Sequence, residues 1–212
     1  MSRPDHLVVV SGTGTDVGKT WVAARLAQAL AERGTAVAVR KPAQSFSPGA
    51  ETDADVLARA TGDDPRRVCP AHRWYEVPMA PPMAAERLGR PPFTIGDLVD
   101  ELDWPGGVSV GLVEGAGGPR SPLASDGGDT VALAVALVPE LVVLVGDAAL
   151  GAINAVTLAA APFDGIAPVC TVLNRYDGRD NLHRRNHDWL ANRVRLDVVI
   201  EVEELAERVL RR

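Results

Sequence analysis

Residues 12–20 read Gly-Thr-Gly-Thr-Asp-Val-Gly-Lys-Thr, directly after a short apolar run and directly before a stretch with helical spacing. Binding a phosphate chain requires a glycine-rich turn whose backbone N–H groups converge on oxygen atoms and a helix N-terminus directed at the anion. It also requires one lysine and one hydroxyl that can hold Mg²⁺. The residues that supply these parts are Gly14, Gly18, Lys19 and Thr20. This stretch therefore predicts a loop that holds the phosphates of a nucleoside triphosphate.

The loop is a variant of the usual one. A glycine usually stands five residues before the glycine of Gly-Lys-Thr, where this chain has Thr13, and Gly12 comes one place earlier. The alternative is a tight turn with a helix cap, but Gly-Lys-Thr between a strand and a helix rarely arises for packing alone. The expected nucleotide contacts in the loop are Gly14, Thr15, Asp16, Val17, Gly18, Lys19 and Thr20.

Short β-branched runs recur along the chain, with helical stretches between them. The runs are residues 7–11, 36–40, 108–113, 141–145, 168–173 and 197–200, and the helical stretches are 20–33, 94–102, 129–137, 154–161 and 181–194. Most runs are apolar on both faces, as strands buried in a parallel sheet are. The pattern predicts an α/β fold with a parallel β-sheet flanked by helices on both faces, like that of P-loop NTPases.

The composition is that of a globular protein. The chain has 212 residues, of which 46% are hydrophobic, so we expect one ATP-binding α/β domain over residues 1–212. The formal net charge of −6 argues against nucleic acid as a partner. No apolar run approaches the length of a membrane span and the first six residues do not resemble a leader, so we expect a cytoplasmic protein that does not bind membranes.

The segment between residues 45 and 92 is rich in Pro, Gly and charge. It has only short stretches with helical spacing, which is more typical of loops that face a substrate than of a separate domain. We therefore expect this segment to contribute to a binding site.

A second motif, residues 113–118, reads Val-Glu-Gly-Ala-Gly-Gly. A carboxylate at the end of a strand can reach Mg²⁺ in a phosphoryl-transfer site, and small residues let a substrate approach the backbone. A solvated glutamate in a turn is equally consistent with this motif alone. Together with the phosphate loop, it favours a metal-binding role for Glu114.

Three further positions are less specific. Lys41 ends the second run, at the edge where ligands of open α/β sheets collect, although a solvated lysine is an alternative. Asp53 begins a short helix, where the helix dipole favours a carboxylate with or without a metal. Asn174 follows the fifth run, and its amide could bind the edge of an adenine or simply belong to a turn.

The chain resembles the dethiobiotin synthetase family over about residues 7–174. The resemblance rests on the phosphate loop, on Lys41-Pro42 with Ser45 shortly after, on Asp53, on the motif at 113–118, and on Leu-Gly-Ala-Ile-Asn at 150–154 with Asn174. It implies a homodimer that uses Mg²⁺ and ATP to close a ureido ring on 7,8-diaminopelargonate with carbon dioxide. One amine captures carbon dioxide as a carbamate, the γ-phosphoryl group moves to the carbamate, and the second amine displaces phosphate.

The resemblance also implies residue roles. Phosphorylating a carbamate brings anionic oxygens together and therefore needs cations, which Lys19 and Lys41 would supply. The expected catalytic residues are Lys19, Lys41, Thr15 and Ser45. The expected substrate contacts are Thr15, Lys41, Ser45, Gly118, Gly151 and Asn154, the last two reaching the substrate of the neighbouring subunit. The expected Mg²⁺ ligands are Thr20, Asp53 and Glu114, and Asn174 is expected to contact the nucleotide.

The sequence departs from the family pattern near its C-terminus. Glu201-Val202 stands where the family usually has Gly-x-Ile-Pro, which frames the adenine, so the preferred base is left open. Two other functions remain open as well: a partition-type or regulatory ATPase, and an ATP-dependent amide ligase. Amide ligases of this type usually carry a glutaminase domain, for which 212 residues leave no room.

Overall fold

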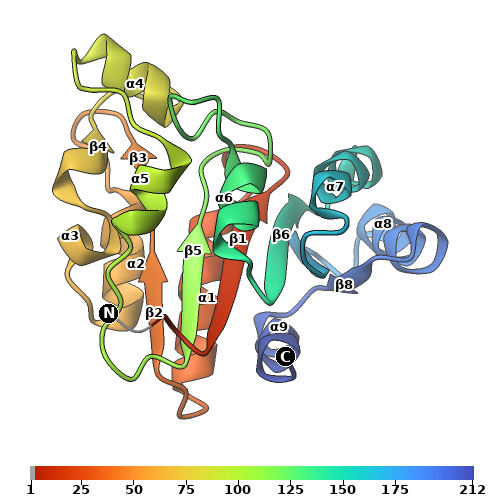
Figure 1. Ribbon diagram of the computed structural model, residues 1–212. Coiled ribbons are helices and arrows are strands. Elements are labelled where there is room, and N and C mark those ends of the chain that lie inside the picture. Colours follow the sequence, from red (N-terminus) through yellow and green to blue (C-terminus); the bar gives the residue numbers. More distant parts are fainter. Residues whose placement is uncertain (1–2) are drawn as a thin grey trace.

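A six-stranded parallel sheet forms the centre of the protein in the computed structural model, which describes residues 3–212 (Figure 1). Its order is β2-β5-β1-β6-β7-β8, and every neighbouring pair is parallel. The strands are β1 (His6–Gly12), β2 (Val37–Arg40), β5 (Val110–Glu114), β6 (Leu141–Asp147), β7 (Val169–Asn174) and β8 (Asp197–Val199). All six agree with the predicted runs to within two residues, which confirms the parallel α/β fold.

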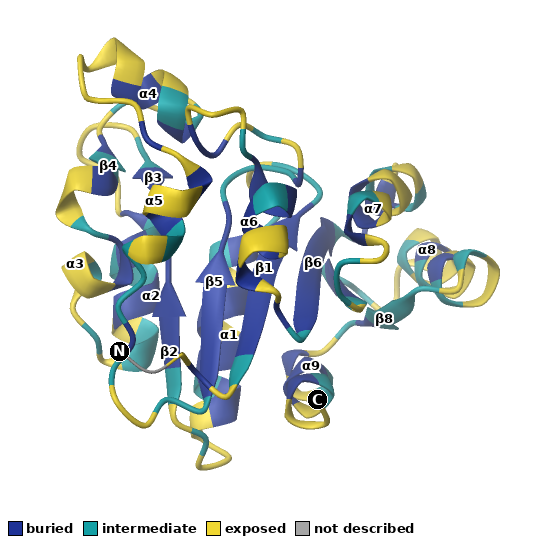
Figure 2. Ribbon diagram, viewed as in Figure 1, coloured by how far each residue is buried: buried dark blue, intermediate teal, exposed yellow. Residues whose placement is uncertain are grey.

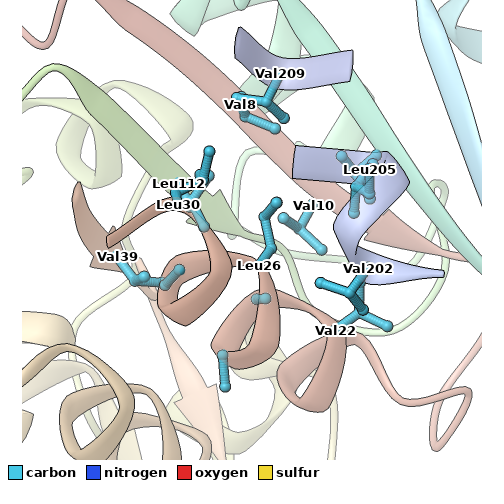
Figure 3. Close-up of a cluster of buried hydrophobic side chains, with 14 of the residues drawn as sticks. Val8, Val10, Val22, Leu26, Leu30, Val39, Leu112, Val202, Leu205 and Val209 are labelled. Carbon is cyan, nitrogen blue, oxygen red and sulfur yellow. The ribbon is translucent and has the colours of Figure 1, made fainter. Parts of the chain in front are cut away.

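One face of the sheet is covered by α1 (Lys19–Ala31), α2 (Asp53–Thr61), α3 (Pro65–Val68) and α9 (Val202–Leu210). Val22, Leu26 and Leu30 repeat at helical spacing on the buried side of α1. Figure 3 shows them packed with side chains of the sheet such as Val10 and Leu112, and shows Val22 next to Val202 of α9. Burial of this apolar stripe stabilises the first strand, the phosphate loop and α1 as one unit.

The other face is covered by α5 (Ile95–Asp100), α6 (Thr130–Leu137) and α7 (Ala152–Ala160), and by Leu190, which directly follows α8 (Asn181–Trp189). Alternate strand residues such as Val9 and Val142 point to this face and pack with Leu98 and Leu133. The sheet is therefore buried on both sides, as its apolar strands require. Figure 2 shows the buried strands between helices whose outer sides are exposed.

The structure adds elements that the sequence patterns did not predict. Helix α9 is one of them, and a two-stranded parallel sheet of β3 (Gln44–Ser45) and β4 (Trp74–Tyr75) is another. The segment predicted as one helix at 181–194 is α8 followed by a π-helical turn, Leu190–Val194. The segment between β3 and α5 also contains a 3₁₀ turn (Ala71–Arg73) and α4 (Pro81–Arg87), and a second 3₁₀ turn (Ala161–Phe163) follows α7.

Among residues 3–212, no helix is both long enough and apolar enough to cross a membrane.

Candidate active site

The phosphate loop connects β1 to α1 at the carboxyl edge of the sheet. Gly18 directly precedes α1 and has a φ of +95°, a backbone conformation that residues other than glycine rarely adopt. The Lys19 ammonium donates to the carbonyl oxygen of Gly14 at 2.7 Å. The amide of Asn174, at the end of β7, donates to the carbonyl oxygen of Val17 at 2.9 Å. The loop is thus held from within and from a strand two positions away in the sheet.

Gly12 and Gly18 are required by their surroundings. A Cβ atom on Gly12 would lie 2.8 Å from the side chain of Val17 and 2.9 Å from that of Lys19. A Cβ atom on Gly18 would collide with the amide of Asn174. Thr13, which stands where the usual loop has glycine, donates its backbone N–H to Val145 of β6 at 2.8 Å. This hydrogen bond holds the start of the loop against β6, and the loop therefore has its first glycine at position 12 instead of 13.

Four polar side chains from four separate elements meet beside the loop. Thr20 lies in the first turn of α1, with its hydroxyl 2.9 Å from both Asp53 and Glu114. The Lys41 ammonium lies 2.7 Å from Glu114 Oε1 and 2.8 Å from Asp53 Oδ2. It also donates to the carbonyl oxygen of Gly115 at 3.0 Å. Two carboxylates, one ammonium and one hydroxyl thus form a single cluster.

The secondary structure explains how the cluster forms. Lys41 directly follows β2, and Glu114 is the last residue of β5, the strand beside it. Asp53 is the first residue of α2, a position set by a capping box in which Thr52 and Asp55 hydrogen-bond to each other's backbone N–H groups. Asp55 is therefore used in the cap, and Asp53 is left to face the site.

Burial and charge shift the pKa values of the cluster in different directions. Burial raises the pKa of Glu114, against the attraction of Lys41. Lys41 lowers the pKa of Asp53, against the effect of burial. Burial opposes the charge on Lys41, but Asp53 and Glu114 outweigh it and raise its pKa. Burial, with Lys41 nearby, lowers the pKa of Lys19 to about 8. Phosphate oxygens bound in the loop would give Lys19 an anionic partner.

The oxygens of Thr20, Asp53 and Glu114 fit a magnesium ion. All three are hard ligands of the kind that Mg²⁺ binds, and it commonly keeps only one or two protein carboxylates. Within the described residues, the second oxygen of Glu114, Oε2, is buried without a hydrogen-bond partner. A buried carboxylate oxygen without a partner is costly, and a cation would satisfy it.

A cavity of about 590 Å³ opens over the loop and the cluster. Predicted site residues that line it are Thr15, Asp16, Gly18, Lys19, Thr20, Lys41, Ser45, Asp53 and Glu114. The segment from Pro78 to Pro81 also lines it and lies within the stretch 45–92 that was expected to contribute to a binding site. The sequence patterns did not indicate Gln44 or Arg175, which line it as well. Gln44 accepts a hydrogen bond from the N–H of Ala54 at 3.0 Å and so supports the helix that carries Asp53. Only the nearness of Gln44 to Lys41 and of Arg175 to Asn174 in the sequence could have indicated them.

The remaining predicted residues lie outside this cavity. Gly118 follows Gly117, which does line it, and packs against the backbone of the phosphate loop. Asn174 lines a second cavity, of about 630 Å³, that shares Gly18 and Arg175 with the first. Gly151 and Asn154 lie at the exposed start of α7 and line neither cavity.

Comparison with known proteins indicates the family of this chain. A family model described as an AAA domain matches residues 6–209. The chain is 39% identical to the ATP-dependent dethiobiotin synthetase BioD of Rhodococcus jostii over 198 residues, which cover 91% of this chain and 84% of that one. It is 36% identical to the protein of the same name from Mycobacteroides abscessus over 211 residues, which cover 96% and 89%. Chloroplast FtsY of Physcomitrella patens shares the fold, with a TM-score of 0.55 at 17% identity over 96% of this chain and 61% of that one.

Proposed function

The chain belongs to the dethiobiotin synthetase family, and we propose that it uses ATP to convert 7,8-diaminopelargonate and carbon dioxide into dethiobiotin, with release of ADP and phosphate. The observation that carries the proposal is the convergence of Lys41, Asp53, Glu114 and Thr20 beside the phosphate loop. The family resemblance implies that Thr20, Asp53 and Glu114 hold Mg²⁺ and that Lys41 acts on the substrate. They come from four different elements, so chance proximity along the chain does not explain their meeting.

The reaction has three balanced steps. One amine nitrogen of the substrate bonds to carbon dioxide and loses a proton, giving a carbamate. A carbamate oxygen then bonds to the γ-phosphorus of ATP as the bond to ADP breaks. The second amine nitrogen finally bonds to the carbamate carbon, loses a proton and expels phosphate, which closes the ring.

Positive charge is what these steps require most, because the carbamate and the triphosphate are both anions. Lys19 is placed by the loop, and its burial together with the nearby charge of Lys41 lowers its pKa. The N-terminus of α1 adds its own partial positive charge. We infer that Lys19 binds the phosphates and that Lys41 holds the carbamate oxygens beside them.

The expected metal ligands are Thr20, Asp53 and Glu114. Magnesium bound there would neutralise charge on the phosphate oxygens and help to align them. Lys41 now balances the two carboxylates, so we expect its ammonium to be shared between them and the carbamate when the site is filled.

The rest of the first cavity fits the aliphatic part of the substrate. Met79, Ala80 and Pro81 line it from one segment, and Ala116 and Pro122 line it from another. The hydroxyl of Ser45 donates to the carbonyl oxygen of Met79, so it ties this apolar segment to β3. We propose that Thr15, Ser45 and the backbone at Gly118 contact the carbamate end of the substrate.

We further propose a homodimer in which each 212-residue chain acts as one ATP-binding domain. Gly151 and Asn154 line neither cavity of their own chain, which supports a role in the site of a partner. Leu150, just before α7, is 87% exposed, and Leu158, within α7, is 65% exposed. An interface would bury both side chains. Because the co-substrate is ATP, we place the reaction in the cytoplasm.

The test measures ADP release by the purified protein with Mg²⁺, ATP and bicarbonate, with and without 7,8-diaminopelargonate. Substrate-dependent release is expected, with a product whose mass shows the added carbonyl. Slow hydrolysis that ignores the diamine would refute the proposal and point to a nucleotide-driven switch.

A further inference from the structure

Trp21 has an unusual position for such a large side chain. It lies in the first turn of α1, directly after Thr20, and is 53% exposed. The buried stripe of the same helix is formed by other residues, including Val22 and Leu26, which are not exposed at all. Trp21 therefore points away from the core, and the packing of α1 does not explain a tryptophan there.

The indole of Trp21 lines the second cavity. Gly18, the residue before α1, lines it together with Trp21 and Arg25 of α1, whose spacing of four residues places them on one side of the helix. The other walls come from the end of β7 and from the connection between β8 and α9. Figure 3 shows Val202, the first residue of α9, close to Val22, which places the start of α9 beside the first turns of α1.

The second cavity continues the first one. Gly18 and Arg175 line both, and Gly18 belongs to the loop that is expected to hold the phosphates. Arg175 donates to the carbonyl oxygen of Asp16 in that loop at 2.7 Å and pairs with Asp147 at 2.7 Å. A nucleotide with its phosphates in the loop has its ribose and base at the far end of the phosphate chain. The second cavity is the space available next to the loop on the side of Gly18.

We propose that Trp21 is the platform on which the nucleobase of the bound triphosphate stacks. This inference rests on the proposed use of ATP. A flat, half-exposed aromatic ring in a cavity next to a phosphate loop is suited to a flat aromatic ligand, and stacking is a substantial source of affinity for nucleotides. A second ring, that of Tyr176, lines the same cavity from the segment after β7 and packs against His183 and His187.

Stacking has a recognisable consequence for base selection. Every base has a π-face, so a stacking platform contributes similarly to all of them. The amide of Asn174 already donates to the loop, which reduces its capacity to select a base edge. We therefore expect Trp21 to contribute about equally to the binding of ATP, GTP and CTP.

The experiment compares Trp21→Ala, Trp21→Phe and a matched control, Trp189→Ala, by calorimetric titration with Mg²⁺ present. Trp189 is 52% exposed, lies at the end of α8 and lines neither cavity. Trp21→Ala is expected to raise the Kd for ATP about tenfold, with a similar factor for GTP and CTP. Trp21→Phe retains a ring and is expected to stay within about threefold of the parent. Trp189→Ala is expected to leave the Kd unchanged.

Inorganic tripolyphosphate is the second probe, because it fills the phosphate loop and has no base. Its Kd is expected to be the same in the parent and in Trp21→Ala, which separates a contact with the base from a distortion of the loop. The parent is also expected to lose indole fluorescence on binding ATP, and Trp21→Phe to lose that change while still binding.

Two results would overturn the inference. If Trp21→Ala binds ATP as well as the parent does, Trp21 is not the platform and the proposed function is untouched. If Trp21→Ala weakens tripolyphosphate as much as ATP, the tryptophan acts on the loop and not on the base. Failure of the parent itself to bind ATP would instead reject the proposed function, and this inference with it.

Discussion

Lys41 determines the charge balance of the site, because its ammonium lies within 2.8 Å of both expected metal-binding carboxylates. Asp53 and Glu114 raise its pKa, so it is a cation throughout the physiological range. The side chain of Glu114 is fully buried, and its negative charge would be costly there without such a partner. The residue that is proposed to bind the carbamate therefore also balances the charge of the expected metal ligands.

Lys19→Ala is expected to lower ADP release by a factor of roughly 100 to 1,000, because the variant lacks a cation at the phosphates. Its side chain makes one hydrogen bond within the described residues, to the carbonyl oxygen of Gly14, so the fold has little to lose. The melting temperature is expected to change by no more than about 4 °C. Both are measured on the same preparation, and a large drop in melting temperature would contradict a purely ligand-binding role.

Glu114→Gln is expected to raise the Mg²⁺ concentration needed for half-maximal turnover by roughly tenfold or more, because a neutral amide is a weaker ligand than a carboxylate. The phosphate loop is unchanged, so the Kd for tripolyphosphate without metal should stay the same. Glu207→Gln, on the exposed side of α9, is the control and should behave like the parent. An unchanged Mg²⁺ titration would show that Glu114 is not a metal ligand.

At the scale of elements, helix starts decide where the functional side chains lie. Helices α2 and α5 begin with the same capping box, Thr52 with Asp55 and Thr94 with Asp97. The first of these helices has Asp53 in the active-site cluster, and the second has no residue in either cavity. The two caps therefore offer a matched comparison between stability and positioning.

Thr52→Ala and Thr94→Ala are each expected to lower the free energy of unfolding by about 1 kcal/mol, the usual effect of losing such a cap. Only Thr52→Ala should also lower turnover, by several-fold, because the start of α2 places Asp53. Urea unfolding and ADP release are the two measurements. Equal turnover in both variants would mean that Gln44 and Lys41 hold Asp53 without help from the cap.

The elements also show what the sequence reveals and what it does not. The six strands and the phosphate loop were predictable because their signals are local: β-branched runs, and glycines beside Lys19 and Thr20. Helix α9 was not predicted, although Val202, Leu205 and Val209 repeat at helical spacing, because it has only nine residues and its N-cap residue, Glu201, makes no side-chain capping hydrogen bond. Strands β3 and β4 contain two residues each, too few for any periodicity. The second cavity depends on how β7, α1 and α9 meet, which no local pattern encodes.

At the scale of the whole molecule, the proposed reaction uses two adjacent cavities and one exposed helix. The first cavity offers apolar walls beside a charged cluster, and the second is proposed to take the base. Helix α7 lies on the outer side of the sheet, away from α2 and α4 (Figure 1). Gly151, directly before α7, and Asn154 within it line neither cavity, and we propose that they serve a substrate bound to another copy of the chain.

Leu158→Glu is expected to convert a dimer into a monomer. A stable dimer buries about 1,200–2,000 Å² in total, and each copy would place a charged carboxylate within that area, at a cost of several kcal/mol. Sedimentation of the parent should give twice the mass of the 22.4 kDa chain, and sedimentation of the variant the mass of one chain. Leu210→Glu changes a leucine that is 46% exposed in α9 and should remain dimeric.

The same variant separates a structural dimer from a shared active site. Each monomer keeps its phosphate loop, Lys41, Asp53 and Glu114, so the Kd for ATP should be close to that of the parent. Ring closure needs Gly151 and Asn154 from the partner if the site is shared, so ADP release that depends on 7,8-diaminopelargonate should fall by at least tenfold. A monomer that retains full substrate-dependent release would show that one chain contains the complete site, and that the exposed leucines serve another purpose.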